Sequence, residues 1–353
     1  MVRRRAPGMY RASAAGRIGP YPEPRITTPG RLGPVMMLVY FLQTALPLIL
    51  ILWLAVLPPK SRAGFWMLVL ASALLTFAAA RLGIWVFPPW WVPYLLALIL
   101  VAAVLWRLIW APQRPPLPSG ALGWLALIII AGIAGSAGLQ SGAAIIASRM
   151  PNGPSTDLAW PLGPGLYLVV NGGASASNNA RAALLDPAQP LHAGFGGSGY
   201  GVDLIAVNDW GFRTGGIMPA DPAGYQIFGT PVLAPCAGRV VLAEGGRPDM
   251  AVPQMDEGHP AGNHVLLRCG DHDILLAHFR QGSLRMEAGD DLAIGQQIAE
   301  VGNSGESSEP HLHIHAQMPG TPDAPFGGAP VPMRLEARFL VRGDVVQAGA
   351  LGQ

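Results

Sequence analysis

The stretch between Pro24 and Thr156 contains no Asp or Glu, and this feature constrains the fold of the 353-residue chain more than any other. Four long apolar runs lie inside it, at about residues 35–57, 64–87, 91–110 and 121–147. Each run is close to the roughly 20 residues that an α-helix needs to cross the ~30 Å hydrocarbon core of a bilayer. The sequence therefore predicts a multi-span α-helical membrane region at residues 34–148, with about four transmembrane helices and the lipid bilayer as a partner.

The segments between the runs support this prediction. Prolines interrupt the apolar pattern where loops are expected, as at Pro58 and Pro59 and again at Pro88 and Pro89. Tryptophans gather near the ends of the runs, as they do at membrane–water interfaces. The alternative, a set of buried helices in a soluble protein, would need many amphipathic partner helices, and the sequence does not supply them.

The charged residues divide the chain into two different parts. Residues 1–156 contain thirteen Lys or Arg and one acid, whereas residues 157–353 contain ten Arg and twenty acids. No basic patch interleaved with aromatic residues occurs in the C-terminal part, so we expect no binding of nucleic acid. Residues 1–33 are rich in Arg, Pro and Gly, which predicts a disordered leader, and translation that starts at Met36 or Met37 would omit it.

The charges flanking the runs give two conflicting topologies. Seven arginines in the first 31 residues would hold the N-terminus in the cytoplasm, and four spans would then place the C-terminal part there too. The basic residues of loops one and three, Lys60 with Arg62 and Arg107 with Arg114, instead place both termini outside. If the leader is not native, only the second argument holds. We therefore expect a multi-pass protein of the cytoplasmic membrane with its C-terminal domain on the periplasmic or extracellular side.

From about Asp157 the chain changes to short apolar segments separated by Gly, Pro and Asn. This pattern predicts an all-β domain, an antiparallel sheet closed like a barrel or sandwich. We place a connector and the first strands at residues 149–189, the domain at 190–345 and a tail at 346–353. Some strand pairs resemble those of lipoyl carriers, but no Lys follows Lys60, which excludes a carrier. Cys236 and Cys269 could form a disulfide or remain two unrelated buried thiols.

All eight histidines fall at or after His192, outside the predicted spans. His311, His313 and His315 alternate along one predicted strand and therefore project from the same face. Two imidazoles on one face can meet a single metal ion or a single substrate. A catalytic zinc ion takes three protein ligands and keeps one open position. The strand is therefore a candidate part of a zinc site.

The segment from Val301 to His313, VGNSGESSEPHLH, resembles the closing motif of the LytM or lysostaphin-type zinc endopeptidases. Other segments that resemble this family follow its order, and they are Tyr200 to Asp203, Pro231 to Val240, Gly262 to Leu267 and Leu275 to His278. The resemblance covers about residues 190–317 and excludes the apolar runs. It implies that the predicted β domain is a peptidase domain.

The resemblance also implies roles for four residues. Asp203 and His313 match two metal ligands, and His278 and His311 match the pair that flanks the metal-bound water. A zinc ion at this site would lower the pKa of that water, so that a hydroxide can attack a peptide carbonyl. A nearby imidazole can then relay the proton and stabilise the oxyanion.

The sequence departs from the family at one ligand. The family has a His four residues before the aspartate, and Gly199 occupies that position here. We expect His192, on a glycine-rich stretch that could fold back, to be the third ligand, with His264 as the fallback. His315 stands where the family has an acid, so a structural role beside the metal ligands is expected.

These observations predict a membrane-anchored zinc metalloendopeptidase that hydrolyses peptide bonds of cell-wall peptidoglycan. Its expected cofactor is Zn²⁺, and its expected substrate is a peptidoglycan peptide or another peptide. The alternative is a catalytically degenerate relative that acts as a cell-wall binding or regulatory module, which the missing histidine favours. A transporter with an external β domain is a third hypothesis, but the predicted spans lack acidic residues. The sequence leaves the protein partners open.

Overall fold

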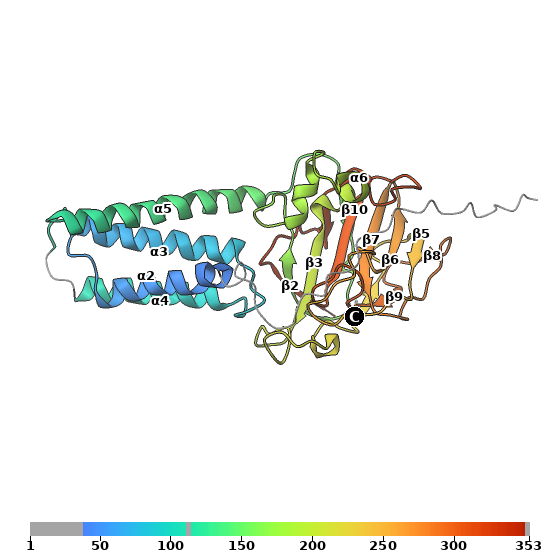
Figure 1. The fold of residues 1–353 in the computed structure, drawn as a ribbon, viewed down its shortest axis with the longest axis horizontal. Coiled ribbons are helices and arrows are strands. Elements are labelled where there is room, and N and C mark those ends of the chain that lie inside the picture. The colour runs from blue at the N-terminus through green and yellow to red at the C-terminus, as the bar shows by residue number, and fades with distance from the viewer. Residues whose placement is uncertain (1–37, 111–113, 350–353) are drawn as a thin grey trace, which may run out of the picture.

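The computed structural model describes residues 38–110 and 114–349. The predicted leader and the last residues of the predicted tail lie outside these ranges. A bundle of helices forms one end of the molecule and a β-rich domain forms the other (Figure 1). We call residues 38–147 the helical region and residues 156–349 the β domain.

The helical region contains the segments η1 (Phe41–Ala45), α2 (Leu46–Val56), α3 (Arg62–Leu82), α4 (Val92–Ile109) and α5 (Ala121–Ala147). Within the described residues, four helices are long and apolar enough to span a bilayer, and η1 together with α2 makes the first of them. Their outward-facing side chains are apolar, with Leu98 65% exposed and Leu139 79% exposed. This confirms the prediction of four apolar helices, which are candidates for membrane spans.

The β domain is built around one large sheet in which all pairings are antiparallel. The order of its strands is β13 (Val345–Ala348), β2 (Gly165–Asn171), β3 (Val202–Val207), β10 (Leu312–Gln317), β7 (His272–Phe279), β6 (Asn263–Cys269), β5 (Gly238–Glu244) and β8 (Asp291–Leu292). A further strand, β11 (Pro330–Val331), pairs with β10. The predicted antiparallel β domain is therefore confirmed.

Smaller elements complete the β domain. Two short sheets are formed by the parallel pair β1 (Thr156–Leu158) and β12 (Met333–Leu335) and the antiparallel pair β4 (Pro231–Leu233) and β9 (Gln297–Glu300). The connections contain η2 (Ala180–Leu185), α6 (His192–Phe195), η3 (Gly196–Tyr200) and η4 (Pro222–Gly224).

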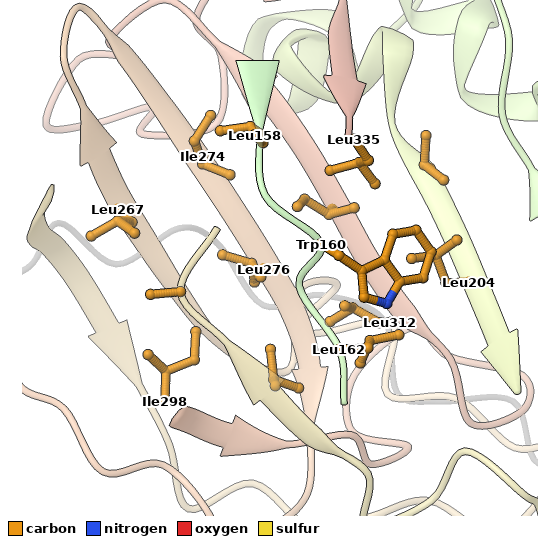
Figure 2. Packing of buried hydrophobic residues seen from close by; sticks show 14 of the residues in the cluster. Leu158, Trp160, Leu162, Leu204, Leu267, Ile274, Leu276, Ile298, Leu312 and Leu335 are labelled. Atoms are coloured by element: carbon orange, nitrogen blue, oxygen red, sulfur yellow. The ribbon is translucent and has the colours of Figure 1, made fainter. Parts of the chain in front are cut away.

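The main core lies between one face of the large sheet and the segment that follows β1. Trp160 and Leu162 of that segment pack over leucines of the sheet, including Leu204 and Leu276 (Figure 2). Both of these leucines are 0% exposed, and burial of each stabilises the fold by about 2 kcal/mol. A disulfide between Cys236 and Cys269, which are 33 residues apart, links the segment before β5 to the end of β6.

The helical region and the β domain meet at the loop between α3 and α4. Trp85 of this loop belongs to a buried apolar cluster with Leu168 of β2 and Ile205 of β3. Polar contacts reinforce the junction, because Arg213 Nη1 donates to the Val86 carbonyl at 2.8 Å and Trp91 Nε1 donates to the Trp210 carbonyl at 2.9 Å. The ends of the helices therefore hold β2 and β3, which lead to the candidate site.

Candidate functional site

The centre of the candidate site is a pair of residues on neighbouring antiparallel strands. Asp203 of β3 and His313 of β10 stand directly opposite each other in the register. Directly opposed residues project from the same face of a sheet, and here His313 Nδ1 lies 2.6 Å from Asp203 Oδ1. An ionised carboxylate can only accept, so the proton of this bond belongs to Nδ1 of His313. The two residues that we predicted as metal ligands therefore form a hydrogen-bonded pair.

The other ring nitrogen of His313 is also engaged. His313 Nε2 lies 2.9 Å from His315 Nδ1, and His315 Nε2 lies 3.3 Å from Gln317 Oε1. These three residues alternate along β10, and each is buried. The predicted same-face arrangement of His313 and His315 therefore places polar groups in a row along the strand. With both rings neutral, His315 Nδ1 donates to His313 Nε2, and His315 Nε2 and Gln317 Oε1 then face each other as two acceptors.

His311 and His278 lie next to each other beside this row. Their ring centroids are 4.6 Å apart, and His311 Nε2 lies 3.8 Å from Asp203 Oδ1. Nδ1 of His311 lies 2.9 Å from the Glu309 carbonyl, and Nδ1 of His278 lies 2.9 Å from the Ser304 carbonyl. Each Nδ1 atom is thus engaged by a backbone carbonyl, and Nε2 is the ring nitrogen of each histidine that these bonds do not use.

His278 adopts a left-handed backbone conformation, with φ at 68°. This conformation costs a non-glycine residue about 1–3 kcal/mol, and surrounding structure must hold it. Backbone bonds on both sides do so, since His278 N donates to the Ala261 carbonyl and its own carbonyl accepts from Gly302 N. Strain held in this way is a common feature of functional sites.

The two candidates for a third ligand lie elsewhere. His192 is on α6, and its Nδ1 lies 2.6 Å from the carbonyl of Leu184. His264 is on β6 and has Ala277 of β7 between it and His313 in the register, so two strand spacings of about 4.8 Å each separate it from His313. Its ring instead packs edge-on against Phe326. The structure therefore brings Asp203, His278, His311 and His313 together without His192 or His264.

The glycine-rich stretch before Asp203 is packed and does not act as a free hinge. A Cβ atom built on Gly199 would lie 2.4 Å from Leu185 Cδ2, and one built on Gly201 would lie 2.6 Å from His313 Cε1. Gly197 is similarly close to Gln317, so η3 is pressed against β10 and η2. These contacts hold the segment between His192 and Asp203 in place.

Burial and nearby charge set the protonation states of the site. Burial works to raise the pKa of Asp203, but the positive charge of Arg181 and the hydrogen bond from His313 outweigh it and hold that pKa well below its usual value. Burial, followed by the charge of Arg181, lowers the pKa of His313 to about 4. Burial is also the main cause that holds the pKa of His278 and of His315 well below the usual value. At neutral pH the Asp203 carboxylate is therefore ionised, and His278, His313 and His315 are neutral.

Three further residues of the site were not found by sequence reasoning. Arg181 of η2 is one, and the other two form a buried ion pair, in which Arg213 Nε lies 2.9 Å from Glu309 Oε2. Their side chains are 7% and 19% exposed. Glu309 precedes His311 by two residues, so this pair connects the histidine segment to Val86 of the helical region through the Arg213 guanidinium. The uneven distribution of charge along the sequence did not mark these three residues as part of the site.

A cavity of about 300 Å³ opens beside the cluster. Asp203, His311, Glu309 and Arg213 form its polar wall. Ile84 and Val86, from the loop between α3 and α4, form part of its apolar wall together with residues of β2 and β3. The cavity therefore lies between the β domain and the ends of the helices, and a ligand in it would contact both.

The donor atoms of the site do not fit a catalytic zinc ion. Within the described ranges, no group of three or more His, Cys, Asp or Glu residues could hold a metal ion. Asp203 and His313 are the two aligned donors, and both nitrogens of His313 already take part in hydrogen bonds. A zinc ligand needs a free nitrogen lone pair directed at the metal, and a catalytic site needs three such protein ligands. The expected zinc site is therefore incomplete here.

Comparison with known proteins identifies the domain. Residues 223–325 match peptidase family M23. This match lies within the β domain and covers 103 of the 353 residues of the chain. The match includes His278, His311 and His313 of the M23 domain but begins after Asp203. It confirms the resemblance that the motifs indicated, since LytM and lysostaphin-type peptidases are M23 proteins.

Individual relatives are more distant. Over 99 residues the chain is 36% identical to an uncharacterized protein of Haemophilus influenzae, a match that covers 28% of this chain and 21% of that protein. The chain thus spans about a fifth of the curated relative that it matches.

Solved structures similar to the chain include M23 peptidases. The catalytic domain of lysostaphin from Staphylococcus simulans is 21% identical, with 48% of this chain and 84% of that one covered and a TM-score of 0.24. A mutant catalytic domain of the prophage-encoded M23 protein EnpA from Enterococcus faecalis is 22% identical, with coverage of 34% and 68% and a TM-score of 0.23. A zinc-containing peptidase from Vibrio cholerae is 17% identical, with coverage of 49% and 41% and a TM-score of 0.26.

Proposed function

We propose that this chain is a membrane-anchored M23 protein that binds cell-wall peptides in the cavity beside Asp203 and His311 and does not hydrolyse them with a resident zinc ion. It would act as a binding or regulatory module of the cell wall. The peptidoglycan class of ligand is carried over from the family. The anchor is the set of four apolar helices, and the charges of their loops favour a periplasmic or extracellular M23 domain.

The observation that carries this proposal is the state of His313. Its Nδ1 bonds Asp203 and its Nε2 bonds His315, so the residue that should be a zinc ligand is part of a hydrogen-bond row. The hydrogen bond from His313 Nδ1 keeps Asp203 oriented. The cluster is therefore built as a rigid polar wall of the cavity.

The composition of the cavity supports a peptide ligand. A peptide offers N–H and C=O groups together with apolar side chains, and the cavity combines polar groups with apolar walls such as Ile205 and Met218. The Asp203 carboxylate can accept from a backbone amide N–H, and so can Nε2 of His311, because Nδ1 of His311 donates to the Glu309 carbonyl. The wall at Ile84 and Val86 would place the bound peptide next to the ends of the helices.

A second candidate is zinc-dependent hydrolysis of peptide bonds, as first predicted from the sequence. One observation favours it, namely that Asp203, His278, His311 and His313 all gather at one site as the family resemblance implies. Four such residues are more than a binding wall needs. This candidate requires a third metal ligand, which the described residues do not supply.

The full chain, purified in detergent or in lipid nanodiscs, can separate the two candidates with a soluble peptidoglycan stem peptide. Isothermal titration calorimetry measures binding, and mass spectrometry of the same mixture measures cleavage. We expect binding without cleavage. Cleaved products, or the absence of binding to the wild type, would contradict the proposal.

Two tryptophan variants make this test specific to the cavity. Ser308 is exposed and lines the cavity, so Ser308→Trp should fill the space and abolish binding of the peptide. Ala288 is also exposed but lies outside the lining of the cavity, so Ala288→Trp should bind as the wild type does. Equal loss of binding in the two variants would show that the peptide binds elsewhere.

A further inference from the structure

The segment that follows β3, residues 208–217, exposes several large apolar side chains, and we call it the Trp210 loop. Trp210 is 74% exposed, Ile217 is 61% exposed and Phe212 is 39% exposed. Elsewhere in the described part of the β domain, exposed side chains of this kind stand singly along the sequence, as at Ile294. Isolated apolar residues are common on any surface, whereas grouped ones mark a site of contact with a protein or a membrane.

Hydrogen bonds within the Trp210 loop give it a defined shape. The Asn208 side chain accepts from the backbone N–H groups of Trp210 and Phe212, each at 3.0 Å. The Asn208 N–H donates to the Phe212 carbonyl at 2.9 Å, and the Gly211 N–H donates to the Asn208 carbonyl at 2.8 Å. Gly211 has a φ of 81°, which a glycine adopts without strain. The backbone therefore closes the loop on itself while the ring of Trp210 stays exposed.

The Trp210 loop is also bonded to the end of a candidate membrane span. Trp91 Nε1 donates to the Trp210 carbonyl at 2.9 Å, and Trp91 is the residue directly before α4. A Cβ atom built on Gly211 would lie 3.0 Å from Trp90 Cδ1, so the loop packs against that ring as well. The loop therefore lies at the level of the first turn of α4.

The length of α4 and the aromatic residues at its ends place this level at a membrane surface. The helix has 18 residues, which extend over about 27 Å at roughly 1.5 Å per residue, close to the ~30 Å hydrocarbon core of a bilayer. Trp91 precedes the helix, and Trp106 and Trp110 lie at its other end. Tryptophans at the two ends of a span lie at the two headgroup layers. The Trp210 carbonyl is bonded to Trp91, so the exposed Trp210 ring lies near the same headgroup layer.

We propose that the Trp210 loop is a second membrane contact of this chain, in which Trp210 and Phe212 insert into the headgroup layer beside α4. An indole ring combines a large apolar surface with an N–H donor, which suits this layer. The one basic residue of the loop, Arg213, is paired with Glu309, so the contact is apolar and not electrostatic. Ile217 of the same loop lines the cavity, which this contact would hold next to the membrane surface.

This inference rests on the membrane anchor of the proposed function, and three labelled positions test the two separately. Single cysteines are introduced into the full chain by Trp210→Cys, Leu98→Cys and Ile294→Cys and labelled with a nitroxide, since both native cysteines are held in the disulfide. Leu98 is 65% exposed and lies near the middle of α4. Ile294 is 59% exposed and follows β8, on the side of the β domain away from the helical region (Figure 1).

The labelled chains are placed, one per disc, in nanodiscs of phosphatidylcholine and measured by electron paramagnetic resonance. Collisions with O₂, which concentrates in lipid, are compared with collisions with a water-soluble nickel complex. The ratio of O₂ to nickel collisions should be highest at Leu98, intermediate at Trp210 and lowest at Ile294, with a severalfold difference between the last two. Thermal unfolding checks that each chain is folded, and Phe212→Cys replaces Trp210→Cys if that variant does not fold.

The possible failures are distinguishable. If Leu98 reports hydrocarbon while Trp210 reports water as Ile294 does, the inference is overturned and the anchor stands. If Leu98 also reports water, the anchor of the proposed function fails together with the inference. If neither reagent reaches the label at Trp210, other parts of the chain cover the loop, and the inference alone is overturned.

Discussion

The helical region exposes large apolar side chains on its outside, whereas the β domain buries most of its large apolar side chains in its interior. Leu98 of α4 is 65% exposed on the outside of the helical bundle, whereas Leu267 of β6 is 0% exposed inside the β domain. The buried residues of α3 and α5 include many small ones, such as Ala71 and Ala134, and small residues allow close approach of neighbouring helices. The β domain instead contains a large apolar core, and the polar row of His313, His315 and Gln317 lies along β10 of the same domain. The contrast makes the helical region the candidate for the proposed anchor, and the Arg213 contact at Val86 joins it to the β domain that carries the candidate site.

Removal of the disulfide should produce the largest difference in stability between the two regions. The bond between Cys236 and Cys269 spans 33 residues, and closing such a loop in the unfolded chain stabilises a domain by about 4 kcal/mol. The double variant Cys236→Ala with Cys269→Ala should lose that amount in the β domain only. Hydrogen exchange, monitored separately in each region during denaturation, measures this loss of stability. An equal loss of protection in α2 to α5 would show that the two regions unfold as one unit.

A pair of leucine variants compares the two kinds of burial directly. Leu267→Ala creates a cavity in the β core and should lower the free energy of unfolding by about 3 kcal/mol. Leu98→Ala removes the same atoms from an exposed position on α4 and should change stability in detergent by less than about 0.5 kcal/mol. Thermal unfolding of both variants checks this. Similar losses would mean that Leu98 packs against another molecule.

Acidification should destabilise the β domain and leave the helical region unchanged. The pKa of His313 is lowered to about 4 in the folded state, below its usual value of about 6.5, so the unfolded chain binds the proton first as the pH falls. Stability is therefore full above about pH 6.5 and declines toward pH 4, by about 2 kcal/mol at pH 5 for this residue. His313→Gln should reduce the slope of stability against pH.

The exposed histidine His259 provides the control for this titration. It forms a surface pair with Asp256 and is 46% exposed. His259→Gln should therefore keep the wild-type slope between pH 4 and 7. A slope that is insensitive to His313 but sensitive to His259 would contradict the account of the buried row.

The smallest effect is expected at the junction of the two regions. Arg213→Gln breaks a mostly buried ion pair and the bond to the Val86 carbonyl, which should lower stability by about 1–2 kcal/mol and raise hydrogen exchange in the loop between α3 and α4. Arg334→Gln breaks the exposed pair with Asp157, where the side chains are 38% and 61% exposed, and should cost less than about 0.5 kcal/mol. Equal effects would show that the junction does not depend on Arg213.

The apolar helices and the antiparallel strands could be predicted because local periodicity determines them. The pairing of Asp203 with His313 followed from the family motif, and the alternation of His313 and His315 followed from the period of a strand. The third position of the site could not be read in this way. The glycine stretch suggested a flexible path for His192, but contacts with Leu185 and Gln317 hold it in place.

The position of Arg181 depends on contacts that no local pattern encodes. Asn179 brings η2 to the start of β3 through hydrogen bonds across more than 20 residues. A buried asparagine and an exposed one look the same in a sequence, so Asn179 gave no indication of this role. Arg213 and Glu309, 96 residues apart, were hidden for the same reason.

The metal content of the wild-type chain distinguishes a zinc site from the hydrogen-bonded Asp203–His313 pair. The full protein is purified from membranes without chelator and without added metal. Zinc per polypeptide is then measured by inductively coupled plasma mass spectrometry. The account predicts a zinc content far below one ion per chain, unchanged in Asp203→Asn and His313→Gln. One zinc ion per chain that disappears in both variants would contradict it, because the Asp203–His313 pair would then be a working metal site.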